Sequence, residues 1–188
     1  MIFINLNESI KIQASQYPTG LPMNTIPSLE PLRTPAKVGA WMFVLWSVLH
    51  IWVGAEGLHQ YLAGNPMSQW TMLIGGRAMP REAFVHASDA ATAFAHGQLI
   101  VNFATDVGGY GVLGLFVAWM ILKGPAWLGY AMGVVVIGIA DLAFLFCMVT
   151  PGVIELNAGT VGGPVIWFLA LLITPFGLPS IHKTPPTS

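Results

Sequence analysis

Residues 98–110 read Gln98-Leu-Ile-Val-Asn102-Phe-Ala-Thr-Asp106-Val-Gly-Gly-Tyr110, inside an apolar run that continues well beyond them. The polar residues recur at every fourth position, and on a helix this spacing advances a side chain by about 40° past a full turn. These four residues therefore form one slowly drifting polar stripe on an otherwise apolar helix. A surface helix of a soluble protein shows the opposite pattern, an apolar stripe in a polar surround. The stretch predicts a membrane-embedded helix whose polar side is turned inward.

The composition of the chain also favours a membrane protein. Charged residues make up 8% and hydrophobic residues 55% of the 188 residues, whereas a soluble domain normally carries about 25% charged residues. The net charge of -1 provides no basic field for nucleic acid. The single cysteine, Cys147, lies in an apolar run, which excludes intramolecular disulfides and cysteine-based metal sites.

Four apolar segments are long enough to cross about 30 Å of hydrocarbon at about 1.5 Å per residue. They are residues 38–62, 91–122, 127–150 and 161–178. Lys123-Gly124-Pro125 ends the second segment and Pro151-Gly152 ends the third. The sequence therefore predicts an all-α integral membrane four-helix bundle over residues 38–181, followed by a polar tail at residues 182–188.

Residues 1–37 contain regularly spaced prolines among Ser, Thr and Asn, and they lack the pattern of a cleavable signal peptide. We expect an extended arm that lies on the membrane surface or on a partner. Four spans put both termini on one side of the membrane. That side carries Lys11, Arg33, Lys37, Lys123 and Lys183, and the other side carries Arg77 and Arg81. The positive-inside rule thus predicts cytoplasmic termini in an inner or plasma membrane.

Two glycines in the third span predict a close helix contact. Gly129 and Gly133 lie on the same helix face as Asp141. Small residues let membrane helices approach closely, so this contact would bring Asp141 to the bundle interior. The same glycine pair, like the arm at residues 1–37, is also a candidate contact for a partner membrane protein.

Three carboxylates and two histidines fall inside predicted spans: Glu56, Asp106, Asp141, His50 and His96. A charged side chain at mid-membrane costs roughly 2.5–3.5 kcal/mol on insertion scales. Such residues usually face a cavity, pair with one another or change their protonation state. The cluster leaves three interpretations open.

The first interpretation is structural, because polar side chains often join membrane helices by hydrogen bonds. Asn102 or Asp106 would then bond to Tyr61 or Thr105. The second interpretation is a pocket for an apolar molecule with one polar group. Its predicted catalytic residues are Glu56 or Asp106, exchanging a proton, with His50 as donor or acceptor. Its predicted substrate-binding residues are Gln98, Asn102, Tyr110, Asp141 and Trp167.

The third interpretation is a haem held by His50 and His96 as axial ligands on facing helices. A mismatch in depth disfavours it, because His50 is central in its span and His96 lies near the first loop. A metal pair of the carboxylate type would need Glu-x-x-His on two helices. Glu56-Gly-Leu-His59 supplies one such motif and no second one follows, so we predict no metal and no resident cofactor.

Five short motifs together resemble the EXPERA group of four-span membrane proteins, which includes the sterol isomerases called emopamil-binding proteins. The motifs are His50, Glu56-Gly57, Ala104-Thr105-Asp106 with Tyr110-Gly111, Gly138-Ile-Ala-Asp141, and Gly163-Pro164-Val-Ile-Trp167. The resemblance covers residues 38–178. It departs from the family in the wider spacing of His50 and Glu56 and in an Asp at the acidic position of the second span. Small bacterial families such as BphX-like and DoxX-like proteins look equally similar.

The resemblance implies an intramembrane acid that protonates a sterol-like double bond while a neighbouring group stabilises the cation. The sequence thus predicts a membrane protein whose polar pocket binds or isomerises a lipid-like molecule by acid–base chemistry. The alternative is a non-catalytic accessory subunit of a larger membrane complex, for which the proline-rich arm is the main argument. Expected partners are membrane lipids, the lipid-like ligand and a membrane protein, with no nucleic acid.

Overall fold

The computed structural model describes residues 31–65 and 70–180. Four helical segments in the described part are long and apolar enough to cross a membrane. They are Thr34–Leu62, Ala90–Lys123, Ala126–Val149 and Ala158–Gly177. The predicted all-α bundle of four membrane-suited helices is confirmed, and it is compatible with an integral membrane protein. Most of the predicted arm and the polar tail lie outside the described residues.

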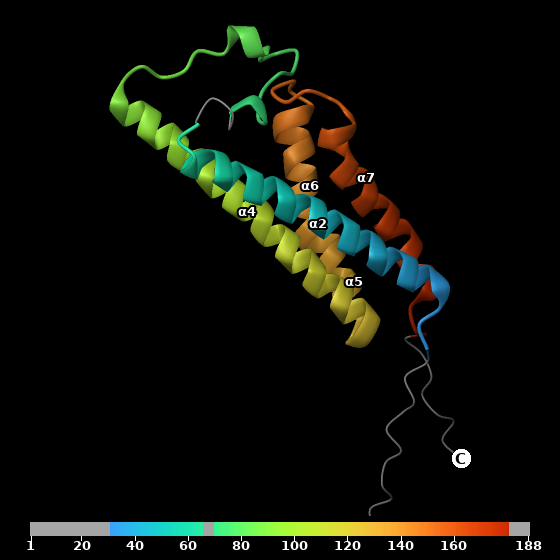
Figure 1. Cartoon of the computed structure of the whole chain (residues 1–188). Coiled ribbons are helices and arrows are strands. Elements are labelled where there is room, and N and C mark those ends of the chain that lie inside the picture. Colours follow the sequence, from blue (N-terminus) through green and yellow to red (C-terminus); the bar gives the residue numbers. More distant parts are fainter. Residues whose placement is uncertain (1–30, 66–69, 181–188) are drawn as a thin grey trace, which may run out of the picture. The chain divides into compact units, whose positions relative to one another are not determined.

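The spans are built from the following elements, labelled as in Figure 1. The first is α2 (Thr34–Leu62) and the second is α4 (Ala90–Lys123). The third combines α5 (Ala126–Met132), the π-helical segment η2 (Gly133–Ile137), α6 (Gly138–Phe144) and a second π-helical segment, η3 (Leu145–Val149). The fourth is α7 (Ala158–Ile173) with the 3-10 helix η4 (Thr174–Gly177). A long loop between α2 and α4, here called loop one, contains the 3-10 turn η1 (Arg81–Ala83).

Helix starts follow local sequence signals. α2 begins at Thr34, earlier than the predicted residue 38, because Pro35 fits the first helical turn. At α4 the Asp89 carboxylate accepts the Thr92 backbone N–H at 2.8 Å, and this bond holds the pKa of Asp89 below its usual range. At α7 the Asn157 and Thr160 side chains bond reciprocally to each other's backbone N–H groups.

α2 and α4 lie side by side through small residues that let their backbones touch (Figure 1). A Cβ atom at Gly54 would lie 2.6 Å from the carbonyl oxygen of Ala104 and 2.7 Å from the Cα of Gly108. A Cβ atom at Gly111 would lie 2.8 Å from the backbone nitrogen of Ile51. Real Cβ atoms do not approach backbone this closely, so the seam between α2 and α4 requires glycine.

The glycines of the third span pack inside the same chain. A Cβ atom at Gly129 would lie 3.1 Å from the backbone nitrogen of Ile121 in α4. One at Gly133 would lie 2.6 Å from the Phe43 ring and 3.1 Å from Val117. The predicted close contact is therefore confirmed, because both glycines pack against other helices of the same chain. A contact of this pair with a partner membrane protein stays a prediction.

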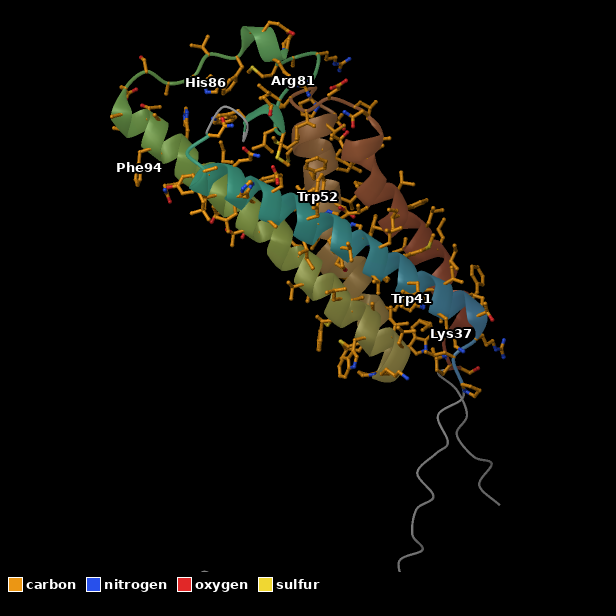
Figure 2. The ribbon with its side chains drawn as sticks, viewed as in Figure 1. Lys37, Trp41, Trp52, Arg81, His86 and Phe94 are labelled. Carbon is orange, nitrogen blue, oxygen red and sulfur yellow. The ribbon has the colours of Figure 1, made fainter. Side chains whose placement is uncertain are left out.

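The surface of the bundle carries large apolar side chains along its length. Trp41 and Trp52 are each 64% exposed and Phe94 is 67% exposed, and Figure 2 shows the three at different levels along the bundle. Lys37 lies at one end of the bundle, while Arg81 lies in loop one at the other end. An apolar belt with charges at its two ends suits a bilayer rather than water.

We predict that Gly54→Ala lowers the unfolding temperature of the protein in mild detergent. Overpacking of this kind costs about 1–3 kcal/mol, because the added methyl group meets backbone atoms of α4 that cannot move aside. Gly109→Ala is the matched control, since a Cβ there meets nothing within 4 Å and alanine favours the helix. Equal unfolding temperatures for the two variants would show that the seam tolerates a side chain.

We expect loop one and the turn before Ala126 to lie on opposite sides of the membrane. Single cysteines placed at residues 81–83 and at 123–125, in a Cys147→Ala background, should label from opposite sides with an impermeant maleimide in sealed vesicles. The positive-inside rule places loop one outside the cytoplasm. Labelling of both segments from the same side would contradict the four-span topology.

Candidate functional site

A cavity of about 800 Å³ lies between the helices in the half of the bundle nearest loop one, and we call it the intramembrane cavity. Its walls come from α2, α4, α6, η3 and the first turns of α7. Residues 71–74 and Arg81 of loop one, with Ile154, Glu155 and Asn157, complete it. The lining is mostly apolar, with a few convergent polar groups. This size and character are typical of sites for small organic ligands, which are about 300–1,000 Å³.

Three side chains form a polar cluster on the cavity wall: Trp46, His50 and Asp141. The indole N–H of Trp46 donates a hydrogen bond to Oδ2 of Asp141 at 2.9 Å. The second carboxyl oxygen, Oδ1, lies 3.8 Å from Nε2 of His50. Asp141 is 3% exposed, so the predicted interior position of this carboxyl group is confirmed.

The orientation of His50 is fixed by its own helix. Its ring stacks on Trp46 one turn earlier, with centroids 3.7 Å apart. Nδ1 of His50 lies 2.8 Å from the carbonyl oxygen of Trp46. Because a carbonyl oxygen can only accept, Nδ1 must carry the proton, and Nε2 is the atom turned toward Asp141. Gly163 of α7 makes room for the ring, since a Cβ there would lie 2.7 Å from Cε1 of His50.

Asp141 is held in α6 between the two π-helical segments η2 and η3. Such π segments within helices are frequent at functional sites. Gly138, one turn before Asp141, packs on the Trp167 ring, where a Cβ atom would lie 2.5 Å from Cζ2. Trp167 itself donates its indole N–H to the carbonyl oxygen of Gly133 at 2.9 Å. Trp167, predicted to bind substrate, is not among the residues that line the cavity and instead joins α7 to the third span.

The polar stripe of α4 divides into two parts. Gln98 donates to the Tyr61 hydroxyl of α2 at 2.8 Å, which is the helix-joining role of the structural interpretation. Asn102 donates to Asp106 on its own helix at 2.9 Å. Asp106 and Tyr110 line the intramembrane cavity, whereas Gln98 and Asn102 are not part of its lining. The stripe therefore contributes one carboxylate and one hydroxyl to the site.

Glu56 does not join His50, although both were predicted to act in catalysis. Its carboxylate accepts a hydrogen bond from Gln60 at 2.5 Å and lies 3.7 Å from Nδ1 of His59. Glu56 is not among the lining residues of the cavity. Six residues separate the two positions on α2, which turns their side chains to different faces.

The two histidines suggested as haem ligands make separate contacts. His50 lies against Asp141, whereas His96 meets the Trp70 ring edge-on, with centroids 5.8 Å apart. Across residues 31–65 and 70–180 no group of three or more His, Cys, Asp or Glu side chains is placed to hold a metal ion. The expectation that the chain has no resident cofactor stays a prediction.

Sequence reasoning missed Trp46 as a site residue. A tryptophan in an apolar span looks like a lipid anchor or a core residue, and its polar indole N–H shows its use only when a partner is nearby. The position of Trp46 four residues before His50 was the available signal, because residues four apart on a helix are neighbours.

No family model, curated protein or solved structure matches this chain. The resemblance to the EXPERA group stays a prediction.

We predict that the bond between Trp46 and Asp141 couples α2 to α6 energetically. In a double-mutant cycle of Trp46→Phe and Asp141→Leu, each single variant strands a buried polar group, at a cost of about 1–3 kcal/mol. The double variant should therefore lose less stability than the sum of the two losses, as followed by unfolding in detergent. Trp41→Phe combined with Asp141→Leu is the control pair and should be additive.

Proposed function

We propose that this chain is an integral membrane protein that binds, in its intramembrane cavity, an apolar molecule bearing one polar group. The observation that carries the proposal is the buried carboxyl of Asp141 on the wall of a large, mostly apolar cavity. Burying a carboxyl group in the membrane is unfavourable in free energy unless the group is paired or serves in binding or catalysis. Oδ1 of Asp141 lies 3.8 Å from Nε2 of His50, which is too long for a hydrogen bond. A polar group of the ligand can therefore bond to both side chains.

The chemistry that this cluster supports is proton exchange. Nε2 of His50 and Oδ1 of Asp141 face each other, so a proton held by either one can be given to a bound molecule and another taken back. Such an exchange isomerises a double bond without any oxidant or reductant. This agrees with the reaction implied by the resemblance to the EXPERA group. We assign the acid to Asp141 with His50, in place of Glu56, because Glu56 lies outside the cavity lining.

The competing interpretations account for less of the described structure. Interhelical hydrogen bonding explains the bond of Gln98 to Tyr61 and that of Trp167 to Gly133, but it gives no reason for a cavity beside Asp141. The accessory-subunit alternative rests on the arm, most of which lies outside the described residues, and it stays a prediction.

The experiment is to purify the full chain in lipid nanodiscs and to identify retained small molecules by mass spectrometry. We expect a bound apolar molecule with one polar group, and Asp141→Asn should lower its retention at least tenfold because an amide can neither ionise nor give up a proton to the ligand. Glu82→Gln removes an exposed carboxylate of loop one that is not among the cavity's lining residues, and it should retain the molecule fully.

Three carboxylates line the cavity, those of Asp106, Asp141 and Glu155. Asp106→Asn tests the one on α4 against Asp141. If the ligand is turned over, loss of the true acid should slow turnover by about 10²-fold or more, the usual scale of general acid–base catalysis. We expect that loss for Asp141→Asn and a smaller one for Asp106→Asn. A larger loss in Asp106→Asn would return the acid role to the α4 stripe. Full retention and full turnover in a folded Asp141→Asn variant would refute the proposed function.

A further inference from the structure

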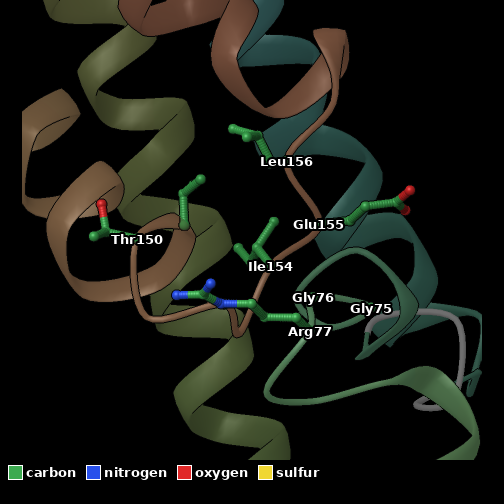
Figure 3. A pocket seen from close by; sticks show the side chains of 9 residues that line it. Gly75, Gly76, Arg77, Thr150, Ile154, Glu155 and Leu156 are labelled. Atoms are coloured by element: carbon green, nitrogen blue, oxygen red, sulfur yellow. The ribbon is translucent and has the colours of Figure 1, made fainter.

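A second pocket, of about 440 Å³, lies at the loop-one end of the bundle, and we call it the Arg77 pocket (Figure 3). One side is formed by Gly75, Gly76 and Arg77 of loop one. The other side is formed by the end of η3 and the turn that follows it, through Val149, Thr150, Gly152, Ile154, Glu155 and Leu156. The pocket borders the intramembrane cavity at Ile154 and Glu155, which line both, but it does not include the Trp46, His50 and Asp141 cluster.

Loop one is fixed to this turn by backbone pairing. Gly75 and Ile154 form an antiparallel bridge, and the Gly76 N–H donates to the carbonyl oxygen of Val153 at 3.0 Å. The Ala78 N–H donates to the carbonyl oxygen of Gly152 at 2.8 Å. The pocket is therefore built by paired backbone rather than by two unconnected loops.

Arg77 supplies a positive charge to this pocket, which the Glu155 carboxylate also lines. Its aliphatic side-chain carbons pass over Gly152, where a Cβ atom would lie 2.7 Å from Cγ of Arg77. Gly152 also has a positive φ of 81°, which favours glycine. Arg77 forms no ion pair with any residue in the described part of the chain. The Glu155 carboxylate is engaged by Arg81 at 3.4 Å, and it points away from the Arg77 guanidinium in Figure 3.

The depth of the pocket places it at the boundary between hydrocarbon and headgroups. Val149 is the last residue of the third span and Thr150 follows it, and both line the pocket. Leu156, on the same rim, is 73% exposed, which gives an apolar contact beside the charge. Phospholipid phosphates occupy this depth, and a guanidinium binds phosphate in a two-pronged geometry.

We propose that the Arg77 pocket binds the phosphate of an anionic membrane phospholipid, with Arg77 as its charge partner and the Thr150 hydroxyl as a further donor. The lipid chain then runs along Leu156 toward the bilayer. This site is independent of the ligand proposed for the intramembrane cavity.

The test uses the full chain in phosphatidylcholine nanodiscs containing a minor fraction of phosphatidylglycerol. Native mass spectrometry counts the phosphatidylglycerol molecules that stay bound. We expect Arg77→Gln to lower their retention about fivefold, the effect of one basic side chain near the membrane surface. Thr150→Val keeps every charge and should lower it less. Lys123→Gln removes a positive charge at the other end of the bundle and should have no effect on this count.

Two results would overturn the proposal. One is equal retention by folded Arg77→Gln and Lys123→Gln, which would mean that Arg77 makes no specific contact. The other is displacement of the bound lipid by millimolar inorganic phosphate, which would assign the pocket to a soluble phosphate. The cavity ligand should remain bound in Arg77→Gln, so failure of this site is distinguishable from failure of the proposed function.

Discussion

The close contact between α2 and α4 is the constraint on which the rest of the structure depends. Without side chains at Gly54 and Gly111, the two backbones come within van der Waals distance, and dispersion forces act along most of both helices. The same seam sets the rotation of α2, because a Cβ atom at Gly114 would lie 3.1 Å from the Trp46 ring. With its rotation set, α2 directs Trp46 and His50 toward the third span.

The third span places a buried carboxyl group, that of Asp141, opposite these two side chains. In a medium of low dielectric constant an unpaired Asp141 would be strongly unfavourable, and the indole N–H of Trp46 supplies the needed donor from another helix. The bond ties α6 to α2 at one carboxyl oxygen and leaves the other toward His50. Beside that oxygen, α6 and α2 stand apart enough for the intramembrane cavity. The same helices therefore provide both the close backbone contacts that hold the bundle together and the polar groups on the cavity wall.

Loop one closes the end of the bundle that contains the cavity. Residues 71–74 and Arg81 belong to the cavity lining, and the backbone pairing of residues 75–78 with residues 152–154 holds the loop against the last turn of the third span. Ile74 and Ile154, on either side of this pairing, are both buried, with 5% and 2% exposure. The loop therefore gives the cavity a defined wall on the side nearest the headgroups.

The sequence by itself determined the class of fold. Long apolar runs interrupted by Pro and Gly admit little besides membrane-suited helices, since backbone polar groups in lipid must bond within the helix. It also determined that Asp141 is interior, because Gly129 and Gly133 mark the packed face of the same helix. Both are properties of a single helix, and the helical period of 3.6 residues lets them be inferred from the spacing of residues in the sequence.

Only the tertiary structure decided which polar groups meet. Glu56 and His50 share a helix and were predicted to act together, yet Glu56 bonds within its own turns and His50 meets Asp141, 91 residues further along the chain. Trp46 became a donor to a carboxyl group, and Trp167 a link to Gly133, through contacts between helices. The rotation and depth of one helix against another follow from side-chain packing across several elements at once, and the local pattern of a single helix does not contain them.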